Sequence, residues 1–210
     1  MSETGFGRRA FLGTAVVGSA VCAWPAQAQT DDMPLTKALE LRRSTRAFQP
    51  ERGVDDETLL ALAWAGQGIN RPETGLRTAP SWHGATETKL YVADASGVRL
   101  YDPAANSLLS VLPTDIRPII SPQPFVATAP VCLIYAADLA GMPTDAPDEE
   151  KRTFATVDAA IVAQNVYLFC ASRGLGTCLV GGVDAAKVQE TLTMGARVIA
   201  TFAQPVGWPA

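Results

Sequence analysis

The sequence predicts an α+β fold, in which helices and strands are mixed within one domain. Segments with apolar residues at helical spacing occur between strand-like runs along the 210-residue chain. A hairpin signature at residues 94–97 (DASG) joins two of those runs, and a tight turn of this kind connects antiparallel strands. The hairpin therefore argues against a doubly wound parallel sheet and favours a layered α+β structure.

Two helices are predicted near the start of the folded part. The first, at 34–41, stops at a polar cluster, and Pro50 then removes a backbone donor. The second opens at Asp55 with an acidic first turn, which suits the positive end of the helix dipole, and its apolar face runs to Gly66. Residues 71–84 are rich in turn-forming residues and predict a loop.

The rest of the chain predicts more strands than helices. Strands at 89–93 and 98–101 flank the hairpin turn, and 107–112 adds a third. Four prolines between residues 114 and 130 predict an irregular connection. The remaining elements are a buried strand at 131–136, a long helix at 153–172 with Gly174 as its C-terminal cap, a strand at 177–180, a helix capped by Asp184 that runs to Met194, and a last strand at 198–206.

The first 28 residues predict a twin-arginine export signal. Arg8-Arg9 precede a weakly apolar run at 14–21, which is too short to span a bilayer, and residues 26–28 (AQA) form a small-x-small cleavage site. We therefore expect a mature domain of residues 29–210 that the twin-arginine machinery exports in folded form to the periplasm or beyond. No stable membrane anchor is expected.

Charge and cysteine content exclude several classes of function. The formal net charge is −4, and removal of two arginines and one glutamate with the signal makes it about −5, so nothing attracts nucleic acid. Cys132, Cys170 and Cys178 remain in the mature chain without CxxC spacing, which argues against a disulfide framework and a zinc site and allows at most one bridge. Lipid attachment at Cys22 is the alternative to signal cleavage, but bulky Val21 stands beside that cysteine.

The densest chemical signal is the run of residues 42–46 (RRSTR) at the end of the first helix. Three guanidinium groups and two hydroxyls within five residues form an anion clamp, and a phosphate monoester suits it because the planar guanidinium binds two phosphate oxygens at once. The alternative is a solvated basic turn that pairs with the carboxylates of residues 55–57.

Glycines and the one histidine offer weaker signals. Residues 174–176 with Gly181 and Gly182 lack the GxGxxG spacing of a dinucleotide loop, so the last two permit close approach to a flat ligand or form an ordinary strand-end turn. His83 is too isolated for a metal site, and none is expected. A Ser81–His83 relay is disfavoured, because residues two apart in a loop rarely face each other and no GxSxG elbow is present.

Taken together, five segments resemble the nitroreductase superfamily of FMN enzymes, with the azoline-oxidase-type branch nearest. They are RRSTRAF at 42–48, LAWAGQGI at 62–69, RTAPS at 77–81, QN at 164–165 and GLGT at 174–177. The resemblance spans nearly the whole mature chain. Azoline oxidation itself is disfavoured, because the stretch before Asp158 is too short for the Lys-Tyr pair of true azoline oxidases.

The resemblance implies a central antiparallel sheet flanked by helices, an intertwined homodimer and one FMN at each subunit interface. It implies that Arg42, Ser44 and Arg46 hold the ribityl phosphate, with Arg43 in support. It places two segments against the flavin ring: a loop from the partner subunit, and a backbone stretch whose Gly181 N–H faces N5. Their residues are Pro80, Ser81 and Trp82 in the loop, with His83 as a candidate proton donor, and Leu179, Val180, Gly181 and Gly182 in the backbone stretch.

The function implied is an exported FMN-dependent oxidoreductase that passes electrons through flavin N5 to a small electron-poor acceptor, such as a nitro compound or a quinone. NAD(P)H, the usual donor of the family, is a cytoplasmic metabolite. The alternative is a redox-inactive protein of the same fold that binds flavin or an aromatic ligand, because Trp82 and His83 replace the smaller residues often found there. A flavin-free structural dimer would leave the arginine cluster unused.

Overall fold

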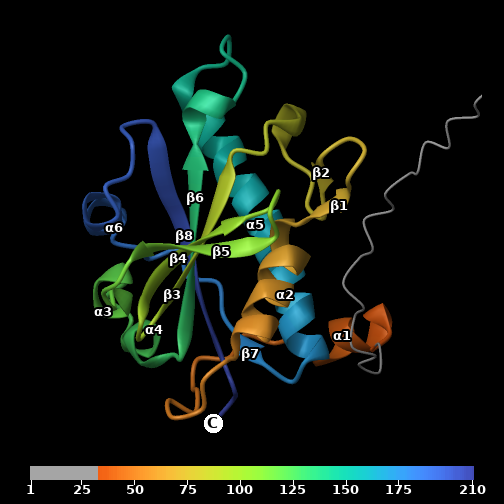
Figure 1. Ribbon diagram of the computed structural model, residues 1–210, viewed down its shortest axis with the longest axis vertical. Coiled ribbons are helices and arrows are strands. Elements are labelled where there is room, and N and C mark those ends of the chain that lie inside the picture. The colour runs from red at the N-terminus through yellow and green to blue at the C-terminus, as the bar shows by residue number, and fades with distance from the viewer. Residues whose placement is uncertain (1–32) are drawn as a thin grey trace, which may run out of the picture. The chain divides into compact units, whose positions relative to one another are not determined.

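A computed structural model describes residues 33–210, and Figure 1 shows how their elements are arranged. The predicted export signal, its cleavage site and the Cys22 alternative lie outside the described residues.

Six strands form one antiparallel sheet in the order β5-β4-β3-β6-β8-β7. The predicted hairpin is confirmed, because Asp94 pairs with Gly97 across its turn. The α+β class and the central antiparallel sheet are confirmed as well. The strands are β3 (Thr88–Asp94), β4 (Gly97–Asp102), β5 (Ser107–Leu112), β6 (Val131–Asp138), β7 (Gly176–Thr177) and β8 (Val198–Gly207).

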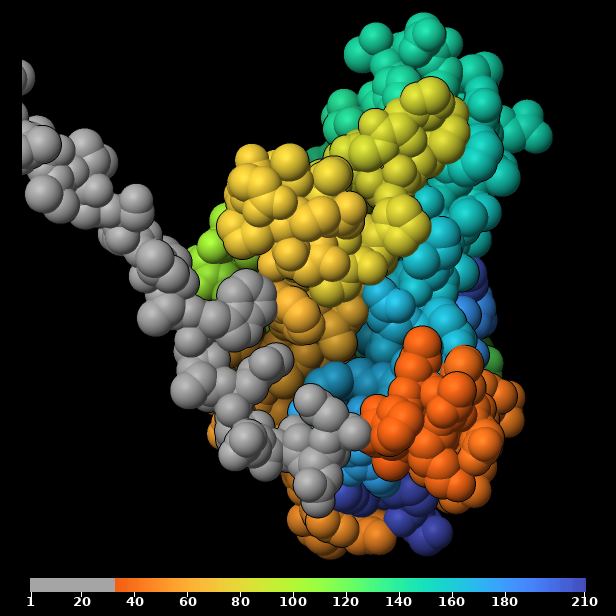
Figure 2. Space-filling model, turned by 90° about the vertical axis from the view of Figure 1, so that its right-hand side faces the viewer, coloured from red at the N-terminus to blue at the C-terminus, as the bar shows by residue number. Residues whose placement is uncertain are grey.

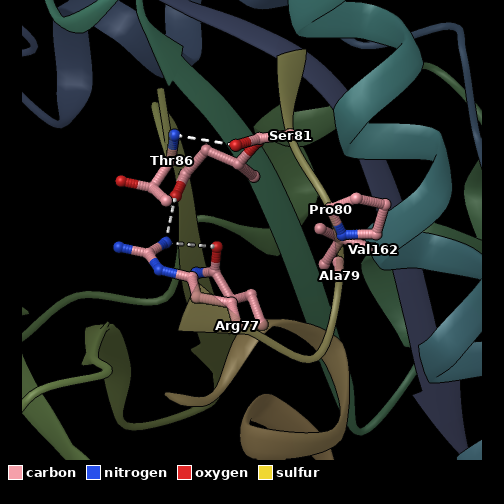
Figure 3. A pocket seen from close by; sticks show the side chains of 8 residues that line it. Arg77, Ala79, Pro80, Ser81, Thr86 and Val162 are labelled. Carbon is pink, nitrogen blue, oxygen red and sulfur yellow. Dashed lines mark hydrogen bonds between the residues drawn. The ribbon is translucent and has the colours of Figure 1, made fainter. Parts of the chain in front are cut away.

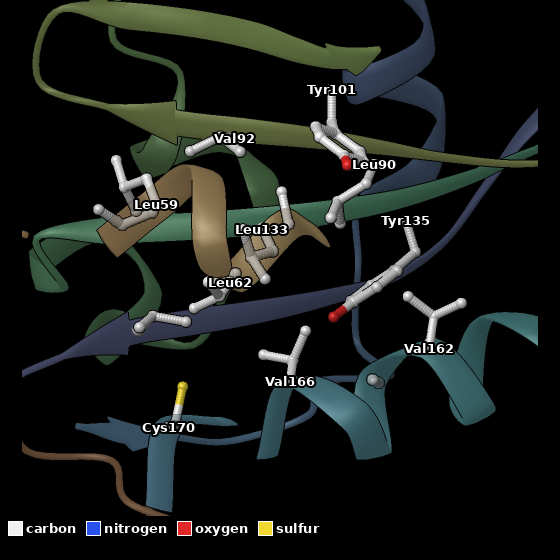
Figure 4. Packing of buried hydrophobic residues seen from close by; sticks show 14 of the residues in the cluster. Leu59, Leu62, Leu90, Val92, Tyr101, Leu133, Tyr135, Val162, Val166 and Cys170 are labelled. Carbon is white, nitrogen blue, oxygen red and sulfur yellow. The ribbon is translucent and has the colours of Figure 1, made fainter. Parts of the chain in front are cut away.

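Helices cover both faces of this sheet (Figure 1). One layer holds α2 (Asp56–Gln67) and α5 (Asp148–Ser172), and the other holds α3 (Arg117–Ile120), α4 (Pro124–Thr128) and α6 (Ala185–Thr191). Successive strand residues point to opposite faces, so β6 sends Leu133 and Tyr135 into the first layer (Figure 4) and Cys132 and Ile134 into the second. Burial on both faces explains the continuous apolar run that predicts this strand.

α5 is the longest described helix and the main support of the candidate site. By length and composition alone it could cross a membrane, with a mean hydropathy of 1.4 over its most apolar window. In the fold it is a core helix instead, because Ala159, Val162, Val166 and Cys170 pack against the sheet (Figure 4). The short helix α1 (Leu35–Leu41) packs on it.

The segment predicted as a loop at 71–84 contains regular structure. β1 (Ile69–Arg71) pairs with β2 (Leu76–Arg77), and a 3-10 helix, η1, covers Trp82–Gly84. Gly75 between the two strands has a φ of 69°, the left-handed conformation that allows a tight reversal. Strands this short carry too little alternation for the sequence to indicate them.

Other boundaries differ from prediction for identifiable reasons. The connection at 114–130 forms α3 and α4, because Pro118 and Pro124 lie in first turns, where the missing N–H has no helical partner to lose. α5 begins at Asp148, earlier than the predicted 153, since its acidic first turn favours a helix N-terminus. α6 ends at Thr191, short of the predicted Met194, and η2 (Leu139–Gly141) follows β6.

The cysteines of the described chain are buried and unpaired. Burial raises the pKa of the Cys132 thiol to about 12, so this group is a neutral core residue.

Candidate functional site

The arginine run leaves α1 as an extended segment beside the edge strand β7. The Thr45 N–H donates to the Thr177 carbonyl at 2.8 Å, and Ser44 pairs with Thr177 as a parallel bridge. Because side chains alternate along an extended chain, Arg42, Ser44 and Arg46 share one side. Arg43 and Thr45 line a cavity of about 140 Å³ that Tyr167 of α5 also lines.

No carboxylate among residues 33–210 forms an ion pair with these arginines. The acidic turn at 55–57 has other partners: Asp56 binds Arg99 at 2.6 Å, and Asp55 caps α2 by accepting from the Thr58 N–H at 2.8 Å. The alternative of a basic turn paired with that acidic turn is therefore not what the fold forms. Within residues 33–210, the charges of Arg42 and Arg46 therefore stay available for an anion.

Tyr167 of α5 connects the arginine segment to a second part of the site. Its hydroxyl lies 3.0 Å from Ser44 Oγ and accepts from the Leu179 N–H at 2.7 Å. Arg42 Cζ lies 5.3 Å from the centre of the Tyr167 ring. Sequence reasoning missed this tyrosine, and the only signal was a polar tip on a mostly apolar helix.

The stretch from Leu179 to Gly182 presents open backbone at this point. Val180 pairs with Ala203 of β8, and the chain then leaves the sheet. Gly181 and Gly182 are exposed, and their φ angles do not require glycine. A Cβ there would meet no atom closer than 3.4 Å. No hydrogen bond among the described residues has the Gly181 N–H as its donor.

The loop carrying Pro80, Ser81 and Trp82 lies elsewhere, beside the N-terminal half of α5. Ser81 Oγ accepts from the Thr86 N–H at 2.9 Å, and Val162 of α5 lines the same small pocket (Figure 3). No hydrogen bond or ion pair among the described residues joins this loop to the arginine segment. Figure 2 shows α1 and this loop at opposite ends of one face of α5.

His83 is exposed in η1 with a left-handed φ of 51°. Its neighbour Trp82 turns its indole onto Phe154 of α5, with ring centres 4.6 Å apart and planes 3° apart. The hydroxyl of Ser81 accepts the Thr86 N–H, and no hydrogen bond in the described part of the chain links it to His83. A serine–histidine relay is therefore not formed.

The structure thus brings together Arg42, Ser44 and the 179–182 backbone, through Tyr167, and leaves Pro80–His83 apart from them within one chain. The assembled part fits FMN by its donor set. Unpaired guanidinium groups and a hydroxyl suit a phosphate, and an exposed glycine backbone with a free N–H suits a flat ring that has an acceptor nitrogen. Within residues 33–210, no three His, Cys, Asp or Glu side chains cluster as metal ligands would.

Known proteins resemble this chain in sequence. The model of the nitroreductase family matches residues 39–208. A protein described as a nitroreductase from Methanocaldococcus jannaschii is 29% identical over 172 residues, which are 77% of this chain and 85% of the relative. An FMN reductase (NADPH) from Bacillus subtilis is 30% identical over 60% of this chain, and the match spans about half of the relative, 53%.

A solved structure extends the likeness over the whole chain. The crystal structure of a protein from Ralstonia eutropha, described as a nitroreductase, has 33% sequence identity and a TM-score of 0.82. It covers 99% of this chain and 96% of its own.

Proposed function

Because this chain belongs to the nitroreductase family and is an FMN-dependent oxidoreductase of that family, we propose that it transfers electrons to a small electron-poor acceptor, such as a nitro compound or a quinone. The proposal rests on Tyr167, whose contacts connect the two parts of the site. One hydroxyl contacts both Ser44, beside the unpaired arginines, and the N–H of Leu179, beside the open glycine backbone.

Each part of the site has a proposed role. Arg42, Ser44 and Arg46 bind the phosphate, and Arg43 supports the segment from its other side. The Gly181 N–H is the donor available to ring nitrogen N5. FMN, when bound, supplies hydride transfer at N5, and a donor there adjusts its reactivity. The protein then needs few reactive side chains of its own.

We further propose a homodimer, in which a second copy supplies the loop of Pro80–Trp82 and places His83 as a proton donor. Exposed apolar side chains support this. Leu35, Leu39 and Leu41 of α1 are 62%, 52% and 41% exposed, and Val157 of α5 is 45% exposed. Figure 2 shows α1 and α5 on one face, which a second copy would cover.

Two finer assignments rest on the sequence. The five segments that resemble the family, taken together, favour its azoline-oxidase-type branch, without azoline oxidation itself. Residues 1–28 favour export by the twin-arginine route, which carries folded cargo and would allow FMN to be bound before export. Outside the membrane, either another donor then replaces cytoplasmic NAD(P)H or turnover is slow.

The second candidate is a redox-inactive protein that binds flavin or an aromatic ligand. The bulk of Trp82 and His83 in the loop favours it, because large side chains there leave less room for an acceptor.

One experiment separates the two candidates. FMN-loaded protein, free of oxygen, is mixed with NADPH or a chemical reductant and then with a quinone or nitroarene. We expect the yellow flavin band to bleach and return, and light scattering of the same sample to give a dimer. Bound flavin that never responds to any donor and acceptor pair would favour the binding protein, and a chain that takes up no FMN would refute both.

A further inference from the structure

Two buried carboxyl groups meet behind the loop of Pro80–Trp82. Glu87 lies just before β3 and is 3% exposed, and Asp158 of α5 is 4% exposed. The Trp82 N–H donates to Asp158 Oδ2 at 2.7 Å. The Glu87 and Asp158 side chains are within hydrogen-bonding contact of each other. Two carboxylate anions have no proton to share, and Glu87 Oε2 has no hydrogen-bond partner in the described part of the chain.

A single proton between the two groups resolves this arrangement. Two buried carboxylates in contact cannot both be ionised without a large repulsion, so one of them keeps its proton. Asp158 Oδ2 accepts the Trp82 N–H at 2.7 Å, whereas Glu87 accepts from its own backbone N–H and, at 3.4 Å, from Thr88 Oγ1. Burial, with Asp158 as neighbour, raises the pKa of Glu87 to about 7.

Within residues 33–210, no cation forms an ion pair with Glu87 that would neutralise the carboxyl pair in place of the proton. Arg77 of β2 interacts electrostatically with Glu87 but forms no ion pair with it within residues 33–210. Burial lowers the pKa of Arg77 below its ordinary value. On α5, the next cation on the same side is Lys151, about two turns earlier. On β3, Lys89 is bound to Asp138 at 3.2 Å.

The pair lies at the two ends of a strained turn. Residues 82–86 form a tight loop in which His83 and Thr86 have φ angles of 51° and 52°, a left-handed conformation that costs a non-glycine residue free energy. Asp158 accepts a hydrogen bond from the Trp82 N–H at the start of the turn, and Glu87 is the residue directly after its end. A bond between the two carboxyls therefore closes the base of the turn.

We propose that Glu87 and Asp158 share one proton, and that this carboxyl pair positions the turn of residues 82–86. Both are positioning residues, since they act through Trp82. Their importance for the flavin site rests on the proposed function, which sets this turn against the flavin. As pH rises through about 7, Glu87 loses the shared proton, two anions face each other, and the turn is released.

The free energy of unfolding also depends on this proton. The folded chain keeps on Glu87 a proton that the unfolded chain releases near the ordinary pKa of 4.5, so this group's contribution to stability is complete below that value and falls as pH rises to about 7. Glu87→Gln removes this fall, because its amide donates to Asp158 at every pH.

Hydrogen–deuterium exchange of residues 81–87 in the whole chain, without flavin, tests the proposal. After correction for intrinsic rates, we expect the wild-type turn to open about tenfold more readily near pH 8 than near pH 6. Glu87→Gln should be equally protected at both, with a Tm that no longer falls over this range. Glu190→Gln on exposed α6 is the matched control and should behave as the wild type.

Asp158→Ala should open the turn at both pH values, and Asp158→Asn, which keeps an acceptor for the Trp82 N–H, should retain protection. The proposal would be overturned if exchange in the wild type did not depend on pH, or if Glu87→Gln kept the pH dependence of the wild type. Glu87→Gln is nearly isosteric, so the test holds even if Asp158→Ala does not fold. Failure of the proposed function gives a different pattern, since FMN uptake would then be absent while exchange still depends on pH.

Discussion

Protein carrying Arg42→Ala together with Arg46→Ala is expected to bind FMN at least about 100-fold more weakly than the wild type. Each arginine supplies a charge-assisted hydrogen bond worth about 1.5–3 kcal/mol, and the loss of two amounts to at least two orders of magnitude in affinity. Quenching of FMN fluorescence during titration measures the change. Neither arginine has an ion pair among the described residues, so the fold should survive.

A matched control removes the same net charge elsewhere. Arg71→Ala with Arg152→Ala replaces two exposed arginines outside the site and should leave FMN affinity within a factor of about two, because distant exposed charges are screened. Equal weakening in both double variants would show a general charge effect and contradict the assignment of the phosphate site.

Gly176→Ala is expected to weaken FMN binding about tenfold and to lower stability by about 1–3 kcal/mol. A Cβ at Gly176 would lie 2.7 Å from Thr45 Cγ2 and 2.8 Å from Thr45 Cβ. Because the Thr45 N–H bonds to β7, the clash would push the arginine segment away from the strand that positions it. Thermal unfolding and the same FMN titration measure the two effects.

A second substitution offers a rescue. Thr45→Gly with Gly176→Ala removes the clashing atoms and should recover most of the FMN affinity. Gly141→Ala is the control, since its Cβ would meet nothing within 4 Å. If the double variant binds no better than Gly176→Ala alone, close packing of the two segments does not set the site.

The elements that sequence patterns predicted well are those with strong local causes. The hairpin needs glycine at position 97, where φ is 142° and a Cβ would lie 2.2 Å from the Leu112 carbonyl. Asp184 caps its helix by accepting from the Lys187 N–H, as predicted. The prediction of an irregular connection at 114–130 was wrong, because proline can either break an element or begin one. Only the tertiary packing of α3 and α4 decides between these roles.

The charged residues of the site were predictable from the sequence, but the contacts between its distant segments were not. Residue types alone indicate an anion clamp at 42–46. Tyr167 and the carboxyl pair of Glu87 and Asp158 become meaningful only when α5 brings distant segments together. Asp158 lies far along the chain from Glu87, and nothing in either local sequence indicates a partner.

We expect Arg42 and Arg46, which have no ion pair within residues 33–210, to hold the phosphate of FMN beside the backbone of Gly181. Equilibrium titration of the flavin-free wild type with FMN and with riboflavin, which differs only by lacking the phosphate, tests it most directly. We predict that FMN binds at least about 100-fold more tightly than riboflavin. Equal affinity for the two, or no binding of FMN, would contradict the claim.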